Sequence, residues 1–127
     1  MRRLHFIVGW STVIAFLITG QLMRHHSPPL ITMGDAARLM YRSRHIYILA
    51  AGLVHLMLGV YFQALTGWRQ RVQSAGSVLL VAAVPLLITA FFVETSLDLR
   101  DSTMWSHAGL YSLFGGSMMQ GICGFKR

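Results

Sequence analysis

Apolar residues fall into four long blocks along this chain, with short polar segments between them. An α-helix needs about 20 apolar residues to cross the ~30 Å hydrocarbon core of a bilayer. The blocks cover residues 6–23, 46–65, 75–93 and 103–123. The pattern therefore predicts an all-α membrane protein, in which four transmembrane helices form an antiparallel bundle and a single domain over residues 1–127.

Small and polar residues recur at helical spacing within these blocks. One face of the first block, at spacings of four and three residues, holds His5, Gly9, Thr12, Phe16 and Thr19. In the second block, an arc of about 80° on an α-helix holds His45, Gly52, His55 and Gly59. In the fourth block, one side holds Gly109, Ser112 and Gly116. Such faces pack against other helices in a membrane, so we expect them to line the bundle interior.

Prolines and a short amphipathic stretch interrupt the regular pattern. Pro28 and Pro29 forbid continuation of the first helix and stiffen the loop that follows it. Pro85 lies at the centre of the third block and should kink that helix. Residues 36–43, just before the second block, are typical of a short amphipathic segment at the membrane surface, which is either separate from the second span or continuous with it.

Composition supports membrane residence and excludes a separate soluble domain. Of the 127 residues, 54% are hydrophobic and 12% are charged, whereas a soluble domain carries roughly twice that charged fraction. The net charge of +7 would suggest nucleic-acid binding in a soluble protein. Here the basic residues sit at the span ends, where they suit anionic headgroups and topology. We therefore expect a lipid bilayer, and no nucleic acid, as the partner.

Basic residues beside the spans also predict an orientation. One side of the predicted bundle carries no acidic residue and holds Arg2, Arg3, Arg69, Arg71, Lys126 and Arg127. The other side carries the acidic residues and holds Arg24, Arg38, Arg42, Arg44 and Arg100. Six basic residues against five favour cytoplasmic termini.

The first block resembles a signal peptide, but its length and the lack of a cleavage motif predict a retained span.

Residue types that bind metals are predicted at the outer ends of three spans. His45 begins the second span, Glu94 ends the third and His107 begins the fourth. Two imidazoles and a carboxylate suit zinc, copper or non-haem iron. The alternative is an ion pair of Glu94 with an arginine, for which the candidates are Arg24, Arg42 and Arg44. Together with His55, these residues form a predicted structural polar cluster.

His45 and His107 also suggest a haem site. Small four-helix membrane cytochromes hold haem b between histidines of different helices, and arginines at this level could neutralise the haem propionates. Both histidines lie near span ends, however, and no second histidine pair accompanies them. A haem b or metal-binding redox-support protein is therefore an alternative to a chain without a cofactor.

His55 lies in the middle of the second span, about 15 Å from its outer end. A neutral imidazole at that depth needs hydrogen-bond partners, and Thr12, Thr89 and Ser112 are predicted within reach. A structural histidine is one interpretation and a proton relay is the other. A relay needs further titratable groups, and on the inner half only His5 is predicted.

Catalytic motifs are absent from the sequence. It contains no nucleophile elbow, phosphate-binding glycine loop or zinc-protease helix. Cys123 is its single cysteine, which excludes a disulfide within the chain and a Cys/His metal motif. We therefore expect a structural or accessory membrane protein rather than an enzyme, packed against itself or a larger membrane partner. A small transporter or proton-conducting subunit is a further alternative.

Three short motifs resemble a known family. The stretch Met40-Tyr41-Arg42-Ser43-Arg44-His45-Ile46-Tyr47-Ile48-Leu49, the turn at Trp68-Arg69 and the span end at Phe91-Phe92-Val93-Glu94 are similar to an uncharacterised family of small bacterial four-span inner-membrane proteins. The resemblance implies a multi-pass protein of the bacterial inner membrane, and it implies no activity. His55 departs from the family pattern, in which a smaller amide is expected at that place.

Overall fold

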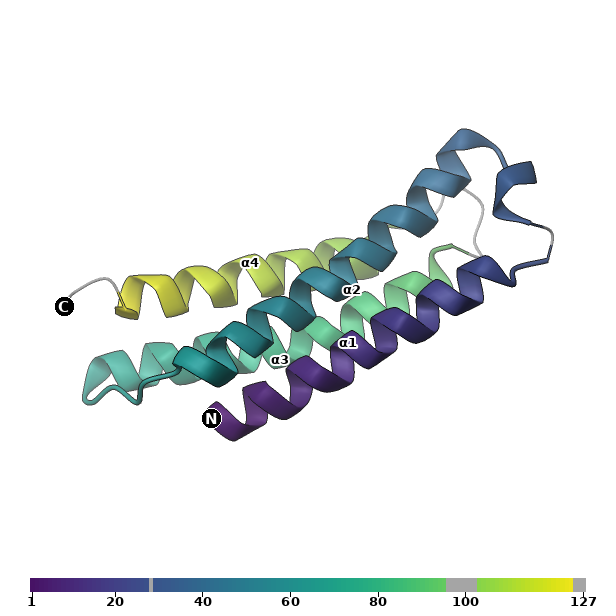
Figure 1. The fold of residues 1–127 in the computed structure, drawn as a ribbon. Coiled ribbons are helices and arrows are strands. Elements are labelled where there is room, and N and C mark those ends of the chain that lie inside the picture. The colour runs from purple at the N-terminus through teal and green to yellow at the C-terminus, as the bar shows by residue number, and fades with distance from the viewer. Residues whose placement is uncertain (28, 96–102, 125–127) are drawn as a thin grey trace.

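The computed structural model describes residues 1–27, 29–95 and 103–124. Within these ranges the chain forms the helices α1 (Arg2–Arg24), α2 (Asp35–Tyr61), α3 (Trp68–Val93) and α4 (Met104–Gly124), with a 3-10 turn at Leu30–Thr32. Consecutive helices run in opposite directions, so that the N-terminus, the α2–α3 loop and the end of α4 lie at one end of the molecule (Figure 1). The all-α prediction is confirmed.

Three of the helices, α1, α2 and α3, are long and apolar enough to cross a membrane. They indicate a membrane protein. The 21 residues of α4 are long enough, but their mean hydropathy is lower than that of the other three helices. The glycines and serines of α4, together with His107 and Gln120, lower it. The prediction of four spans is thus confirmed for three of them.

Helix boundaries differ from the sequence prediction on both sides of the second span. Residues 36–43 are not a separate surface segment, because α2 begins at Asp35 and continues unbroken to Tyr61. No proline interrupts this stretch. The predicted span reached residue 65, but the backbone is already extended at Phe62. Gly67, with a φ of 67°, completes the turn into α3, and α3 continues through Pro85 without a break.

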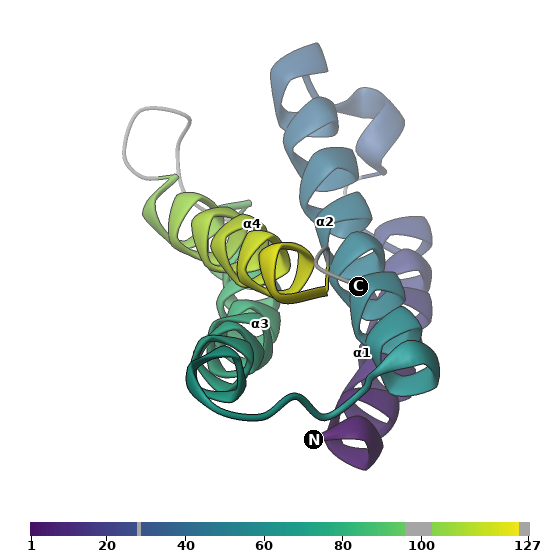
Figure 2. The same cartoon turned by 90° about the vertical axis from the view of Figure 1, so that its left-hand side faces the viewer.

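The helices pack as two hairpins, α1 with α2 and α3 with α4 (Figure 2). Glycines set the spacing of the first hairpin. A Cβ atom on Gly9 of α1 would lie 2.8 Å from Leu56 of α2, and one on Gly59 of α2 would lie 2.7 Å from the backbone of Phe6. Backbones this close leave no space for a side chain between them. The small and polar faces predicted for α1 and α2 therefore do line the interior.

The second hairpin uses the same device. A Cβ atom on Gly116 of α4 would lie 2.7 Å from the carbonyl oxygen of Gly76 in α3, and one on Gly109 would lie 2.7 Å from Leu87. Both α4 glycines are buried. The prediction that Gly109 and Gly116 face another helix is confirmed.

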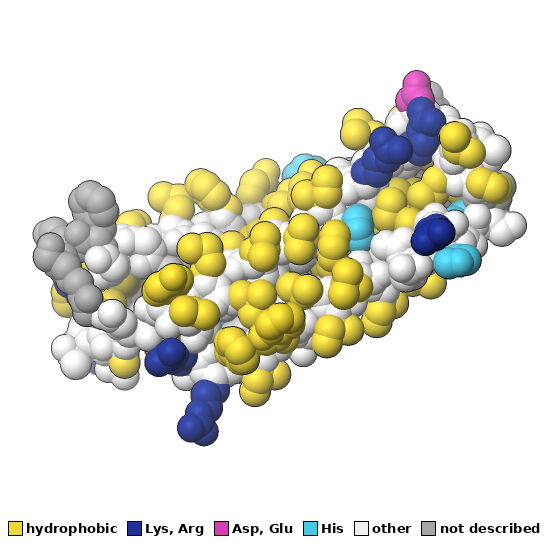
Figure 3. Space-filling model, in the orientation of Figure 1, with side chains coloured by type: hydrophobic (Ala, Val, Ile, Leu, Met, Phe, Trp, Pro, Cys, Tyr) yellow, Lys and Arg dark blue, Asp and Glu magenta, His cyan; other side chains and the backbone are white. Residues whose placement is uncertain are grey.

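Between the hairpins lies an apolar core. Its buried members are Tyr41, Ile48, Ala51, Leu87 and Phe91. Large apolar side chains also cover the outside of the helices along most of their length, whereas arginines gather near the two ends (Figure 3). An apolar surface between two ends that carry arginines is typical of a membrane protein.

The close approach at Gly116 predicts a sharp effect of side-chain size. Gly116→Leu should lower the free energy of unfolding by about 1–3 kcal/mol, because the new side chain overlaps Gly76 and Leu80. The control is Gly121→Leu on the same helix, where nothing lies within 4 Å of an added Cβ atom. Thermal unfolding in detergent measures both. Equal melting temperatures for Gly116→Leu and wild type would contradict the packing.

Candidate functional site

The most unusual polar feature is a histidine pair buried between α1, α2 and α3. His5 and His55 are both 0% exposed. Their Nδ1 atoms lie 2.9 Å apart. The Nε2 atom of His5 is 3.0 Å from the Ser77 hydroxyl oxygen, and that of His55 is 3.1 Å from the Leu80 carbonyl oxygen. We call these residues, with Gln120, the histidine cluster.

One bond determines the direction of all the others in the histidine cluster. A carbonyl oxygen accepts only, so Nε2 of His55 carries the proton that it donates to Leu80. The Nδ1 atom of a neutral His55 is then an acceptor, and Nδ1 of His5 must be the donor. The Nε2 atom of His5 consequently accepts from the Ser77 hydroxyl, whose oxygen accepts from the Gln120 amide at 2.9 Å.

This arrangement satisfies both histidines in the neutral state and draws on all four helices. Gln120 also donates to the Gln73 carbonyl oxygen, 2.9 Å away, which ties α4 to α3. Throughout the described part of the chain, every buried side-chain nitrogen or oxygen has a hydrogen-bond partner. A buried polar group left without a partner costs about 1–3 kcal/mol. The histidine cluster is therefore a specific clamp between the two hairpins.

A second clamp, the carboxylate cluster of Arg44, Glu94 and Ser106, lies at the opposite end of α3. Glu94 is 1% exposed and Arg44 4% exposed. The Glu94 Oε2 atom is 2.8 Å from Nη2 and 2.9 Å from Nε of Arg44. The Ser106 amide donates to Oε1 at 3.1 Å, and its hydroxyl donates to Oε2. One carboxylate thus binds the interior of α2 and the first turn of α4.

The carboxylate cluster is built to hold a charge. Desolvation would raise the pKa of Glu94, but the hydrogen bonds from Ser106 and Arg44 outweigh it and hold this pKa below its usual range. Ser106 is the third residue of α4, where backbone amides have no partner within the helix and the helix dipole favours an anion. Glu94 therefore serves as the cap of α4.

The structure brings together some of the residues predicted at the outer ends of the spans and separates others. Glu94 pairs with Arg44, one of the three candidate arginines, which lies well inside α2. Arg24 and Arg42 are exposed. Arg44 belongs to α2 and not to the loop before it, because α2 begins at Asp35. His55 belongs to the histidine cluster and not to this one.

His45 and His107 have different surroundings. The ring of His45 stacks on Phe16 at a centroid distance of 4.0 Å, and its Nδ1 atom bonds to the Thr19 hydroxyl at 3.0 Å. His107 is exposed and bonds to the Thr103 carbonyl oxygen of its own helix turn. Among the residues that the structure describes, no three His, Cys, Asp or Glu side chains are placed to hold a metal ion. The metal and haem sites remain predictions without geometric support.

Sequence reasoning found His55 but missed its partners. Thr12 bonds to the Val8 carbonyl oxygen of its own helix, and His55 bonds to His5 and to the Leu80 backbone instead of to Thr12, Thr89 or Ser112. The available signal was that His5 lies on the inward face of its helix. Helix depth alone did not show that the α1 and α2 faces meet with these two residues in register.

Comparisons with protein-family models, with curated proteins and with solved structures find no match for this chain. The similarity to small bacterial four-span proteins therefore stays a prediction. Arguments about function rest on the two clusters and on the surface.

The histidine tautomers are directly testable. In ¹⁵N-histidine NMR spectra of the protein in lipid, His5 should be the Nδ1–H tautomer and His55 the Nε2–H tautomer. Ser77→Ala should disturb the His5 resonances and lower the free energy of unfolding by about 1–3 kcal/mol, because Nε2 of His5 loses its donor. Ser74→Ala on the same helix is the control. Two histidines of the same tautomer would contradict the assigned direction.

The carboxylate cluster predicts acid sensitivity. Because the pKa of Glu94 is lower in the folded than in the unfolded chain, its contribution is complete above the ordinary value of 4.5 and is lost as the pH falls through the folded value. Glu94→Gln should lower the free energy of unfolding at neutral pH by about 3–5 kcal/mol, since it leaves Arg44 buried without a counter-charge. It should also flatten the acid limb of the stability curve.

The control for this effect is Asp35→Asn. Asp35 pairs with Arg38 at the surface, where an ion pair contributes about 0–1 kcal/mol. Melting temperatures between pH 3 and 7 compare the two variants. An unchanged acid limb in Glu94→Gln would assign the acid sensitivity to other carboxylates.

Proposed function

We propose that the chain is a small integral membrane protein of structural or accessory type, which packs against itself or a larger membrane partner. One observation carries the proposal: within the described residues, every buried side-chain nitrogen or oxygen has a hydrogen-bond partner, and those of the histidine and carboxylate clusters join one helix of the chain to another. His5, His55, Glu94 and Arg44 all have hydrogen-bond partners within the chain. Another membrane protein, or a second copy of the chain, would therefore contact the outer surface of the helical bundle.

The proposal includes α4 as a fourth span. Although α4 is less apolar than the others, Gly109, Gly116 and Gln120 on one side of it face α3 and make contacts there. Its outer face carries Tyr111, Phe114, Met118 and Ile122, all exposed. An outward apolar face and an inward small face suit a membrane helix that packs on its neighbours. The result is an antiparallel four-span bundle.

The proposed location is the bacterial inner membrane, with both termini in the cytoplasm. Support for the orientation comes from the position of the N-terminus, the α2–α3 loop and the end of α4 at one end of the bundle (Figure 1). That end carries Arg2, Arg3, Arg69 and Arg71 without an acidic residue among those described. Reporter fusions at the C-terminus test the orientation, and periplasmic activity of such a fusion contradicts it.

The histidine cluster raises a second candidate function, that of a proton-conducting subunit. Its hydrogen bonds form a continuous path from Gln120 through Ser77 and His5 to His55. The path ends at the Leu80 carbonyl oxygen. Beyond it lie apolar residues of the core, with Ile48 and Leu87 at most 1% exposed. A path that stops inside the bundle supports a clamp better than a conductor.

Photo-crosslinking tests the accessory proposal. A photoreactive residue replacing Phe114, on the outer face of α4, should give a discrete protein adduct in native membranes. Gly121, seven residues further along the same face of α4, has nothing within 4 Å of an added Cβ atom and permits close helix approach there. The same residue replacing Leu17, which is 60% exposed on α1, should give lipid adducts.

If both positions give lipid adducts and no protein adduct, the accessory proposal is contradicted. Proton flux in liposomes above that of empty liposomes, and lost in His5→Phe, would support the conducting subunit instead. A haem absorption band in the purified protein, lost in His45→Ala, would establish the haem alternative.

A further inference from the structure

Helix α1 has two faces with regular helical spacing, and the chain covers only one of them. The inner face, which includes His5 and Gly9, packs against α2 and α3. The outer face repeats at spacings of three and four residues and is exposed throughout. A seven-residue repeat of this kind is the pattern by which one helix packs along another. We call this face the outer ridge; its members are Leu4, Ile7, Ser11, Ile14 and Ile18.

The outer ridge carries one hydroxyl group, which lies near the middle of α1. Ser11 is nine residues from the start of the helix at Arg2, or about 14 Å along its axis. Thr12 and Thr19 on the inner face donate to carbonyl oxygens of their own helix. Ser11 is exposed and makes no hydrogen bond to a described residue. Since hydrocarbon offers no water at this depth, the hydroxyl gains a hydrogen bond when a polar group of another helix reaches it.

A hollow lies beside the outer ridge, between α1 and α3, which flank one side of the bundle (Figure 2). Its volume is about 310 Å³, and its lining includes Ile7 and Ser11 of the ridge and Val81, Val84 and Ile88 of α3. These branched apolar side chains suit an aliphatic side chain from another helix. A ridge next to a hollow can fit a second copy of itself, because a two-fold axis places each ridge beside the hollow of the other copy.

The membrane fixes how a second copy would meet the outer ridge. Two copies that share the proposed orientation have parallel α1 helices, and the same residues lie at the same depth. Ser11 can then face the same residue of the second copy. A serine hydroxyl both donates and accepts, so the two groups satisfy each other without a further residue. A single polar residue within a seven-residue repeat also specifies the register of two parallel helices.

We propose that the outer ridge of α1 is the contact between two copies of this chain, with the two Ser11 hydroxyl groups bonded to each other across a two-fold axis along the membrane normal. The isoleucines of each ridge pack on α1 of the other copy and fill the hollow beside it. The inference rests on the proposed accessory function and names the partner. Leu17 lies about 120° around α1 from Ser11, turned away from the hollow, and stays in contact with lipid.

Disulfide cross-linking of the full chain in native membranes tests the contact. Ser11→Cys places a thiol at the proposed axis and should give a covalent dimer on mild oxidation. Leu17→Cys on the same helix, at a residue that is 60% exposed, is the matched control and should stay monomeric. Wild type controls for Cys123, which is buried.

Equal dimer yields from the two variants would mean random collision in the membrane and would overturn the contact. The absence of a dimer from Ser11→Cys, or a cross-link from this position to a different protein, would overturn it as well.

Förster energy transfer between labelled copies in liposomes, measured as lipid is added, gives the dimer affinity. Ser11→Ala should weaken the dimer about threefold, the average effect of a hydrogen bond between membrane helices. Ser11→Thr keeps a hydroxyl group and should keep wild-type affinity. Because Ser11 is exposed and unbonded within the described chain, both variants should keep the wild-type melting temperature of the monomer. Equal affinity of wild type and Ser11→Ala would overturn the hydroxyl pair, and a monomer at every dilution would overturn the dimer.

Failure of this inference and failure of the accessory proposal give different results. If Ser11→Cys yields no dimer while the photoreactive residue at Phe114 captures another protein, the chain is an accessory protein and the second copy is not its partner. If neither position captures a protein, both proposals are contradicted.

Discussion

The cost of burying a polar group away from water governs this structure. In hydrocarbon an imidazole, a carboxylate or a guanidinium group finds its partners within the protein or not at all. The chain buries all three kinds and bonds each of them. His5 and His55 serve one another and α3, and Glu94 serves Arg44 and the start of α4. Because these buried groups need partners, their hydrogen bonds determine how the helices are arranged.

The two clusters supply what apolar packing in a membrane lacks. Within each hairpin, glycines bring the backbones into contact, as Gly59 does against Phe6 and Gly116 against Gly76. Such packing sets the distance between helices, but lipid tails compete with apolar side chains on nearly equal terms. Between the hairpins, the bonds at Ser77, at Leu80 and at Glu94 are directional. They define one arrangement of the hairpins out of the many that apolar surfaces would tolerate.

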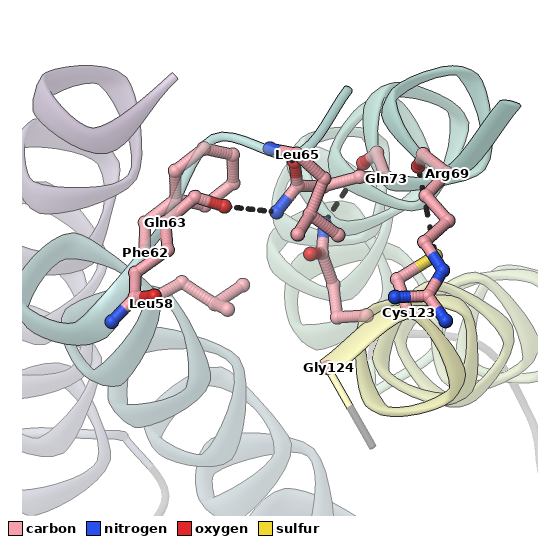
Figure 4. A pocket seen from close by; sticks show the side chains of 9 residues that line it. Leu58, Phe62, Gln63, Leu65, Arg69, Gln73, Cys123 and Gly124 are labelled. Carbon is pink, nitrogen blue, oxygen red and sulfur yellow. Dashed lines mark hydrogen bonds between the residues drawn. The ribbon is translucent and has the colours of Figure 1, made fainter. Parts of the chain in front are cut away.

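The same constraint shapes a cavity at the end of the bundle that carries the α2–α3 loop (Figure 4). Where the loop after α2 returns to α3, Gln73 satisfies the loop backbone and leaves space between Phe62 and the end of α4. The buried histidines lie one hydrogen-bonded residue further in, through Gln120 and Ser77.

Much of the fold was predictable from the sequence, because helix length and the 3.6-residue period are local properties. The apolar blocks identified all four helices, and the spacing of His5, Gly9 and Thr12 identified the buried face of α1. The sequence also narrowed the possible ion-pair partners of Glu94 to three arginines. Tertiary structure alone decided which one, because the choice depends on where α2 begins and how the hairpins dock. It also decided that His55 meets His5, since two residues fifty positions apart become neighbours only through the register of α1 against α2.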